Sequence, residues 1–367
     1  MNILITTRSV PEHTMGGMEY YAKDTALWLS LLGCKVTLLT TALPPNTPTQ
    51  DYTSDTLKIV SLAQCPGGKY SSAWWSASKA FYLKHQASFD AVISVSSAGR
   101  SIAMLKERCP VIMQCHGTAK GEVIAKWKSG SIKNWLKSAK NIKDMLIDYF
   151  AYRHYNHFIA VGDQVYTDLI NRGLSIPSKA VTLIRNGVER NPHTHITNPS
   201  GTKRVLSLSR LHQQKGIQFA IEAFKHKALS NTELHIAGTG PYETQLKKLA
   251  SNAKNIHFLG QIERSHIPKL LSEYDAFIFT STHREGYPLN LLEAMAAGLP
   301  VITSKHLADK LPSSPGVYPV PPRSTEEVAQ KIEQALIGPH SVLPDQFYLE
   351  HVMNQYKVIC EQLCQNL

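Results

Sequence analysis

Short apolar segments alternate with longer amphipathic segments along almost the whole chain, and this alternation most limits the possible folds. Helical periodicity between successive strands predicts parallel sheets with helices on both faces, because a parallel connection needs a long crossover, usually a helix. Strands are expected in the first half at residues 2–6, 35–39, 57–60, 91–95, 111–115, 158–161 and 181–184. A second series is expected at residues 205–208, 233–237, 256–259, 276–279 and 301–303.

A polar, proline-bearing stretch without periodicity separates the two series. At 367 residues the chain is also longer than one hydrophobic core usually serves. We therefore expect two Rossmann-like doubly wound α/β domains that face a central cleft. The expected divisions are a first domain at residues 1–188, a linker at 189–202, a second domain at 203–345, and a C-terminal helix within 346–367 that crosses back to the first domain.

Cysteine usage and apolar patterning bound the class of protein. Six cysteines without a C-x2-C pair predict reduced thiols and neither disulfides nor a zinc site. The sequence has no run of eighteen apolar residues and opens as a strand without a basic leader, so we expect a soluble, cytoplasmic protein. No Asp-x-Asp pair occurs, which disfavours a metal-bridged diphosphate and predicts a metal-independent site.

Two carboxylates, Glu285 and Glu293, stand with seven residues between them just before the last predicted strand. Pro288 is expected in the first turn of a helix, which places Glu285 in the preceding loop and Glu293 about one turn inside. A helix N-terminus offers N–H groups to an anion, and carboxylates accept hydrogen bonds from hydroxyls. A nucleotide sugar presents both kinds of group. The alternative is a solvated acidic helix face.

Two cations, Arg210 and Lys215, lie in a loop between a predicted strand and the helix expected after Gly216. Fixed cations stabilise the negative charge that grows on a leaving diphosphate, and they do so without a metal. The alternative for this pair is a solvated basic loop.

In the first half, Gly16 and Gly17 follow the first strand and open a helix, and His116 follows the fifth strand directly. Paired glycines let the backbone approach a ligand closely, and ligands bind at the carboxyl ends of parallel strands. The alternatives are a flexible turn and a structural histidine. The dinucleotide fingerprint G-x-G-x-x-G is absent, as is an acidic residue that fits a nicotinamide ribose.

Together these motifs resemble the retaining glycosyltransferases of the GT-B fold, specifically glycosyltransferase family 4. The resemblance is carried by E-G-Y-P-x-x-L-L-E-A-M-A-x-G-x-P-V-I, by R-x4-K-G upstream of it, and by the paired glycines and the histidine of the first half. One departure is Gly162-Asp163, where many relatives carry a serine and an acidic residue.

The resemblance implies a role for each matching residue. Glu285 would contact hydroxyls of the transferred sugar and Glu293 the ribose, while Arg210 and Lys215 would hold the diphosphate. His116 would lie near the transferred sugar. Further donor contacts would come from Gly16, Gly17, Gly260, Ile262, and the backbone of Gly286, Tyr287, Pro288 and Leu289.

The resemblance also implies the reaction and its partners. A sugar would pass from a nucleoside diphosphate donor, UDP- or GDP-linked, to a saccharide or lipid-linked saccharide in cell-surface polysaccharide or lipopolysaccharide synthesis. No cofactor other than the donor is implied. A sugar-nucleotide epimerase and, less favoured, a nucleic-acid-binding protein are the alternatives, although no basic stripe carries a recognition motif.

The net charge of +11 implies an anionic partner, and residues 120–153 contribute much of it, with eight basic against three acidic side chains. From residue 132 onward apolar residues recur near helical spacing, which is the pattern of a helix on an anionic membrane surface. A solvated helix packed on the first domain is the alternative. Trp74, Trp75, Phe81 and Tyr82 are expected to add an apolar lip.

Overall fold

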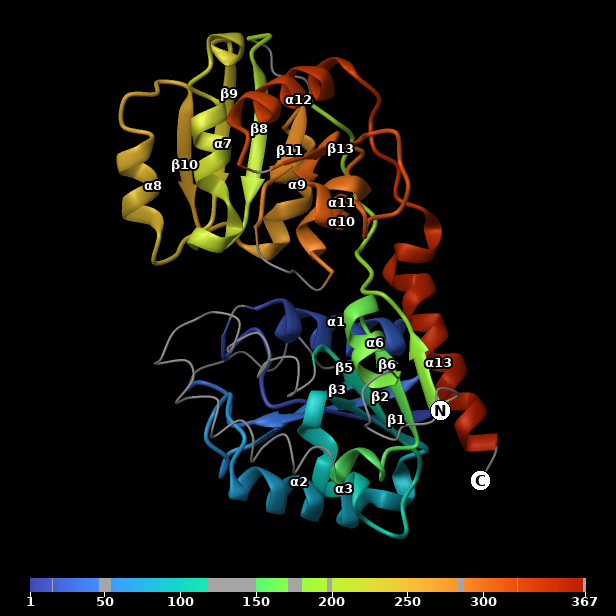
Figure 1. Ribbon diagram of the computed structural model, residues 1–367. Helices are drawn as coiled ribbons and strands as arrows, with labels where there is room; N and C mark the ends of the chain where they lie inside the picture. Colours follow the sequence, from blue (N-terminus) through green and yellow to red (C-terminus); the bar gives the residue numbers. More distant parts are fainter. Residues whose placement is uncertain are drawn as a thin grey trace. The chain divides into compact units, whose positions relative to one another are not determined.

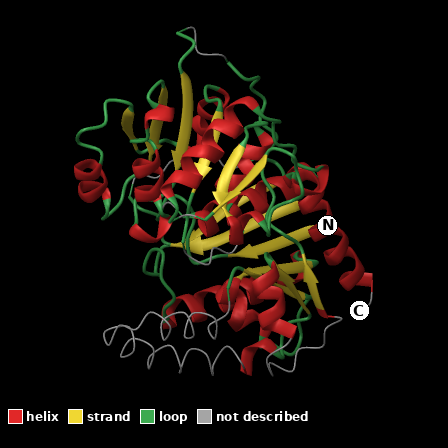
Figure 2. Cartoon of the chain, turned by 45° about the horizontal axis from the view of Figure 1, so that its top comes forward, coloured by secondary structure: helices red, strands yellow, loops and turns green. Residues whose placement is uncertain are grey.

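The chain divides into two compact units in the computed structural model: residues Met1–Asn186 with Leu349–Leu367, and residues Gly187–Tyr348 (Figure 1). The structure describes residues 1–14, 16–45, 54–117, 150–170, 180–196, 200–282, 287–321 and 323–365. Each unit is built on one all-parallel sheet with helices on both faces, so the predicted fold class is confirmed (Figure 2).

The first unit contains a seven-stranded sheet in the order β3-β2-β1-β4-β5-β6-β7. Its strands are β1 (Asn2–Thr6), β2 (Lys35–Thr41), β3 (Leu57–Leu62), β4 (Ala91–Val95), β5 (Val111–Cys115), β6 (His157–Ala160) and β7 (Val181–Leu183). All seven predicted strands are confirmed, with ends that differ from the prediction by at most two residues. Their near-continuous apolar runs reflect burial on both faces of a parallel sheet.

Helices cover this sheet on both faces. The described helices of the first unit are α1 (Gly17–Leu31), α2 (Ser72–His85), α3 (Arg100–Ala103), α6 (Asp163–Ile170) and α13 (Leu349–Gln365), with short 3₁₀ turns at Gln86–Ser88 and Ser96–Gly99. Side chains of α1 and α13 share one hydrophobic cluster with alternate residues of the strands, whereas those of α2, α3 and α6 share another with the residues between. Strand alternation therefore supplies both packing faces.

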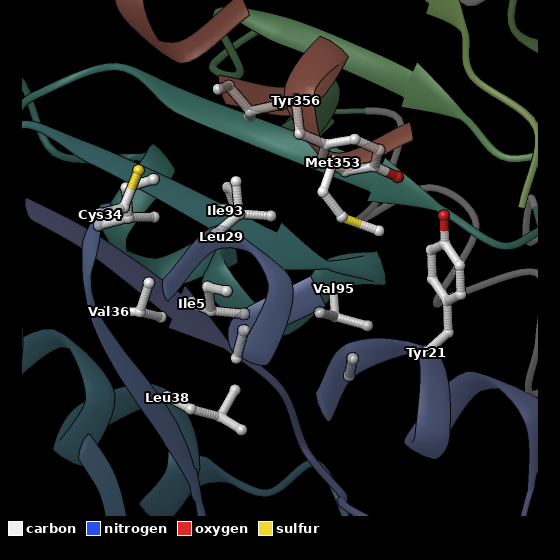
Figure 3. Packing of buried hydrophobic residues seen from close by; sticks show 14 of the residues in the cluster. Ile5, Tyr21, Leu29, Cys34, Val36, Leu38, Ile93, Val95, Met353 and Tyr356 are labelled. Carbon is white, nitrogen blue, oxygen red and sulfur yellow. The ribbon is translucent and has the colours of Figure 1, made fainter. Parts of the chain in front are cut away.

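The C-terminal helix α13 completes the first core. Val352, Met353, Tyr356 and Cys360 are almost fully buried, and they pack with Leu29 of α1 and with the central strands (Figure 3). A buried side chain of this size contributes about 1.5–3 kcal/mol relative to an exposed one. The last helix of the chain is therefore an integral part of the first unit.

The second unit contains a six-stranded sheet in the order β10-β9-β8-β11-β12-β13. Its strands are β8 (Lys203–Leu208), β9 (Thr232–Ala237), β10 (Ile256–Gly260), β11 (Ala276–Phe279), β12 (Val301–Ser304) and β13 (Val317–Val320). Its described helices are α7 (Ile217–Ala223), α8 (Glu243–Leu249), α9 (Ile267–Ser272), α10 (Leu289–Ala296), α11 (Lys305–Ala308) and α12 (Thr325–Ile337), with 3₁₀ turns at Gln213–Lys215, Lys227–Leu229, Arg264–His266 and Asp345–Phe347. β13 was not predicted.

One expectation about the surface of the first unit is wrong. Trp74 and Tyr82 do not form an apolar lip, because their exposed fractions are 0% and 1%. The Trp74 indole N–H donates to the carbonyl of Ala98 at 3.0 Å, which satisfies its polar atom inside the core.

Residues 118–149 lie outside the described residues. They include most of the basic segment, residues 120–153, that is predicted to lie on a membrane surface. Among the helices that the structure describes, none has the length and apolar character needed to span a bilayer.

Candidate functional site

Three loops of the second unit meet at the carboxyl edge of its sheet. The N–H of Ser209 donates to the carbonyl of Ala237 at 3.1 Å, and the N–H of Leu211 donates to Thr239 at 2.9 Å. Gly238 in turn donates to the carbonyl of Gly260 at 2.6 Å. The loops that follow β8, β9 and β10 are therefore fastened to one another by backbone hydrogen bonds.

Gly238 and Gly240 make this close approach possible. A Cβ at Gly238 would lie 1.9 Å from the carbonyl oxygen of Ser209, and one at Gly240 would lie 2.3 Å from that of Leu211. Only glycine fits where two backbones touch in this way. The backbone contact fixes the course of the loop that carries Arg210.

The other end of that loop is fastened to the exit of β11. Gly216 has a φ of 75°, and a Cβ there would lie 1.9 Å from the carbonyl oxygen of Thr280. The Thr280 hydroxyl donates to the carbonyl of Gly216 at 2.9 Å, and the N–H of Thr282 donates to that of Gln214 at 3.0 Å. The segment that leads toward residues 283–286 is thus bound to the loop of the two predicted cations.

The two cations differ in their surroundings. Arg210 is exposed, whereas Lys215 is half-buried and its Nζ lies 5.6 Å from the centroid of the Phe279 ring. A cation over an aromatic face is held electrostatically, which orders the lysine without neutralising its charge. Both side chains belong to the same short loop at the carboxyl edge.

Helix α10 begins one residue later than expected. Pro288 is its N-cap, with an extended backbone (ψ 112°), and Leu289 is the first helical residue. The expectation that Pro288 lies within the first turn is wrong, and the pyrrolidine nitrogen has no proton to donate to a ligand. The side-chain amide of Asn290 donates to the carbonyl of Leu208 at 2.9 Å, which ties this helix end to the end of β8.

The side chain of Tyr287 belongs to the core. It is 7% exposed and stacks on the ring of Phe347, with the ring centroids 6.1 Å apart. Of the other predicted residues of this stretch, Glu285 and Gly286 lie outside the described residues.

Glu293 lies on the second turn of α10 and is paired with Arg264. The Arg264 Nη1 is 2.8 Å from the Glu293 Oε1, and the glutamate side chain is only 14% exposed. Arg264 follows β10 after Gly260 and Ile262, two of the residues expected to contact the donor. The ion pair thereby connects two segments predicted for the same ligand. Sequence reasoning missed Arg264, because no motif marks it.

His116 lies at the end of β5 in a polar network. Its Nε2 is 3.2 Å from the Oε1 of Gln114, whose amide nitrogen donates to Thr25 Oγ1 at 3.0 Å and to the Tyr356 hydroxyl at 3.1 Å. Because the Gln114 nitrogen serves these two acceptors, its oxygen faces His116. The network therefore assigns the proton to Nε2 and leaves a lone pair on Nδ1.

Burial keeps this imidazole neutral. Desolvation penalises the imidazolium form and lowers the pKa of His116 to about 4. The ring of Tyr21 packs edge-on against the imidazole, with centroids 5.7 Å apart, and in Figure 3 its hydroxyl points toward that of Tyr356. Near pH 7 the side chain can accept a hydrogen bond at Nδ1 but carries no charge.

Gly16 and Gly17 lie at the start of α1, and they have different surroundings. Gly16 is the N-cap, and a Cβ there would lie 2.3 Å from the Oε2 of Glu19. The other oxygen of this carboxylate, Oε1, accepts from the Ser9 hydroxyl at 2.8 Å. A Cβ at Gly17 would meet no described atom within 4 Å. Glu19, which is 7% exposed, is a second buried carboxylate that sequence reasoning did not single out.

The departure at Asp163 has a structural partner. Arg185 pairs with this carboxylate through its Nη2 at 2.6 Å and its Nε at 3.0 Å, a bidentate arrangement. The pair joins the start of α6 to the residues that follow β7.

Two family models match the chain, and their ranges together span residues 15–347. The model described as Glycosyltransferase Family 4 matches residues 15–191, and the one described as Glycosyl transferases group 1 matches residues 190–347. The boundary between the two matches lies within a few residues of the boundary between the compact units.

Individual relatives agree with these matches. A putative colanic acid biosynthesis glycosyltransferase, WcaL, of Salmonella typhimurium is 28% identical over 147 residues, which cover 37% of this chain and 36% of that protein. Glycogen synthase of Mycobacterium tuberculosis is 24% identical over 328 residues, covering 83% of this chain and 78% of that protein. The structure of HepE from Anabaena in complex with UDP-glucose superposes with a TM-score of 0.66 at 18% identity, over 100% of this chain and 99% of that one.

Proposed function

The chain belongs to the glycosyltransferases of family 4, enzymes of the GT-B fold, and we propose that it transfers a sugar from a nucleoside diphosphate donor to a saccharide or lipid-linked saccharide with retention of configuration. The observation that carries the proposal is the assembly in the second unit. There the loop of Arg210 and Lys215, the exit of β11 and the start of α10 are bonded together at one sheet edge.

We assign the donor diphosphate to this edge. Arg210 and Lys215 offer two cations, and the N-terminus of α10 adds backbone N–H groups and a partial positive charge. As the bond from the anomeric carbon to the phosphate oxygen breaks, the electron pair stays on the diphosphate, where the two cations stabilise it. No metal is required for this charge balance.

The carboxylates and His116 take the roles that select and orient the sugar. Glu285 accepts from hydroxyls of the transferred sugar, and Glu293, held by Arg264, accepts from the ribose. His116 accepts a sugar hydroxyl at its unprotonated Nδ1. The acceptor hydroxyl attacks the anomeric carbon from the face that the diphosphate leaves, and its proton passes to the departing phosphate oxygen. One carbon–oxygen bond breaks as another forms.

The donor class follows from a binding experiment. We expect one nucleoside diphosphate among UDP, GDP and ADP to raise the melting temperature, because a ligand that binds only the native state stabilises it. UDP is the first candidate, since HepE was solved with UDP-glucose. Each nucleotide sugar is then incubated with the protein alone. Appearance of an altered sugar on an intact nucleotide would instead indicate an epimerase.

We propose a lipid-linked or lipopolysaccharide-type acceptor presented at an anionic membrane surface. The basis is the charge of residues 120–153. Of this segment the structure describes residues 150–153, where Phe150 is exposed and the guanidinium of Arg153 lies 5.5 Å from the centroid of the Phe150 ring. The relative WcaL is described as a putative glycosyltransferase of colanic acid biosynthesis. Co-sedimentation with vesicles of anionic or neutral lipid, at low and high salt, tests this. Equal binding to both vesicle types would remove the membrane from the proposal.

A further inference from the structure

Two histidines and one glutamate converge on the strand pair at the edge of the second sheet. Glu233 and His235 lie on β9, two residues apart and hence on the same face. His257 on the neighbouring strand β10 is in register with His235. One ligand atom from each of the three side chains lies within 4.8 Å of the other two.

From this convergence we propose a site for a divalent transition metal ion, zinc or copper, formed by Glu233, His235 and His257. The Nε2 of His235 lies 3.2 Å from the Oε2 of Glu233, and the two imidazole rings meet edge to face with centroids 4.9 Å apart. Zinc with bonds of about 2.1 Å in a tetrahedron needs its ligand atoms about 3.4 Å apart. The Glu233–His235 pair already has that spacing. The ligand atom of His257, which lies within 4.8 Å of the other two, would have to come closer by side-chain rotation when the ion binds.

The ligand types select the ion. Imidazole nitrogen is a preferred ligand of zinc, copper and nickel, whereas magnesium and calcium prefer sites made of oxygen alone. Two imidazoles and one carboxylate therefore favour a transition metal. They leave the remaining coordination positions to water.

An outer hydrogen bond orients His235 for this role. Its Nδ1 lies 2.8 Å from the hydroxyl of Tyr274, a side chain that is 3% exposed. A histidine that binds a metal through one nitrogen is usually fixed by a hydrogen bond at the other. With Nδ1 engaged by the tyrosine, Nε2 is the nitrogen presented to Glu233 and to the ion.

One neighbouring charge opposes the ion. The guanidinium of Arg204 lies 5.6 Å from the centroid of the Tyr274 ring, and it acts electrostatically on His235. The Glu233 carboxylate offsets this cation. The site therefore depends on all three ligands, and removal of the carboxylate should weaken it as much as removal of a histidine.

The ion would join the edge strand β10 to β9. An edge strand is hydrogen-bonded on one side only, so a cross-strand link adds to its attachment. Three residues after His235 and three after His257 stand Gly238 and Gly260, where the loops of the candidate functional site begin. The role of the ion is structural, and it is separate from the metal-free transfer reaction proposed above.

The test uses the full chain, freed of metal by chelation and dialysis, with zinc chloride as the probe. Zinc should raise the melting temperature of the wild-type protein by a few degrees. His257→Gln and Glu233→Gln should melt like the wild type without metal and lose the zinc effect. His193→Gln replaces an exposed histidine outside the cluster, and this control variant should keep the increase in melting temperature caused by zinc. With copper, electron paramagnetic resonance should show coupling to two nitrogens, and to one in His257→Gln.

Several results would overturn the proposal. A zinc effect of equal size in wild type, His257→Gln and His193→Gln would place the ion elsewhere on this histidine-rich chain. The absence of any zinc effect on the melting temperature of the wild type would also overturn the proposal. So would a copper spectrum of His257→Gln that is the same as that of the wild type. If one ligand variant melts differently from the wild type before zinc is added, the zinc response of the other ligand variant, compared with that of His193→Gln, decides.

Discussion

At the scale of single residues, the two carboxylates of the proposed site have different roles. Glu285 would bind the transferred sugar, and Glu293 would bind the ribose. Glu285→Ala should lower kcat by roughly 100-fold, because contacts to the reacting sugar strengthen in the transition state. Glu293→Ala should instead raise the KM for the donor about tenfold, the effect of losing one hydrogen bond to a charged group. Steady-state kinetics of both variants give the comparison.

Arg264→Ala is the matched probe for Glu293. It removes the partner at 2.8 Å but keeps the carboxylate, so the donor KM should rise while kcat changes little. If all three variants keep wild-type kinetics in a folded protein, the assignment of this helix end to the donor is wrong.

The two cations should act on turnover. Arg210→Ala or Lys215→Ala is expected to lower kcat by about 100-fold or more, the loss of one preorganised group that stabilises the leaving diphosphate. Activity of the wild type should survive EDTA. Rescue of a chelated, inactive enzyme by magnesium or manganese would contradict a reaction driven by side-chain cations alone.

His116 gives a pH dependence with a definite sign. Its pKa is about 4 in the folded chain, below the ordinary value of about 6.5, so between these values the unfolded chain binds more protons. Stability from this group is therefore fully present above pH 6.5, and it is lost as the pH falls toward 4. Urea unfolding of wild type and His116→Gln at pH 7, 6 and 5 should show that the unfolding free energy of the wild type falls relative to that of the variant as the pH is lowered. A difference in unfolding free energy that stays constant with pH would mean that the imidazole titrates normally.

At the scale of elements, the loop between β8 and α7 depends on one glycine. Gly216→Ala puts a Cβ against the Thr280 carbonyl at a φ of 75°, and we expect a loss of about 1–3 kcal/mol in unfolding free energy together with reduced turnover. Gly17→Ala is the control. The added Cβ at position 17 would have no described atom within 4 Å, so the unfolding free energy of this variant should differ from that of the wild type by about 0.5 kcal/mol or less. Equal effects would show that the backbone contact is unimportant.

Most strands were predictable because buried parallel strands are continuous apolar runs bounded by polar loops. β13 was missed since it is short, lies at the sheet edge and contains Pro319, a residue that edge strands tolerate. Trp74 and Tyr82 were misplaced because helical periodicity identifies an apolar face but not what it packs against. The local sequence does not show which side chains of two separate segments meet in the folded chain. For this reason Arg264 was not foreseen as the partner of Glu293, although Glu293 itself and the nearby Gly260 and Ile262 were predicted.

At the scale of the whole molecule, the first unit needs both ends of the chain. Deletion of residues 349–367 removes five almost fully buried side chains from its core, at about 1.5–3 kcal/mol each. That sum is comparable with the total stability of a typical domain, which is about 5–15 kcal/mol. We expect the first unit to unfold and the second to keep its own melting transition in calorimetry. A protein that ends at Gln365 should melt like the full chain, and a deletion variant that retains both transitions would contradict this role of α13.

The same helix sets an order of events during synthesis. The second unit is one uninterrupted stretch, Gly187–Tyr348, so all of its strands have been made before α13 exists. The first unit, although translated earlier, leaves the ribosome with the apolar face beside α1 uncovered. Its apolar face stays uncovered until Leu349–Gln365 has left the ribosome. A nascent chain stalled before these residues emerge would therefore carry a folded second unit and a first unit with exposed apolar surface, which is the state that chaperones recognise.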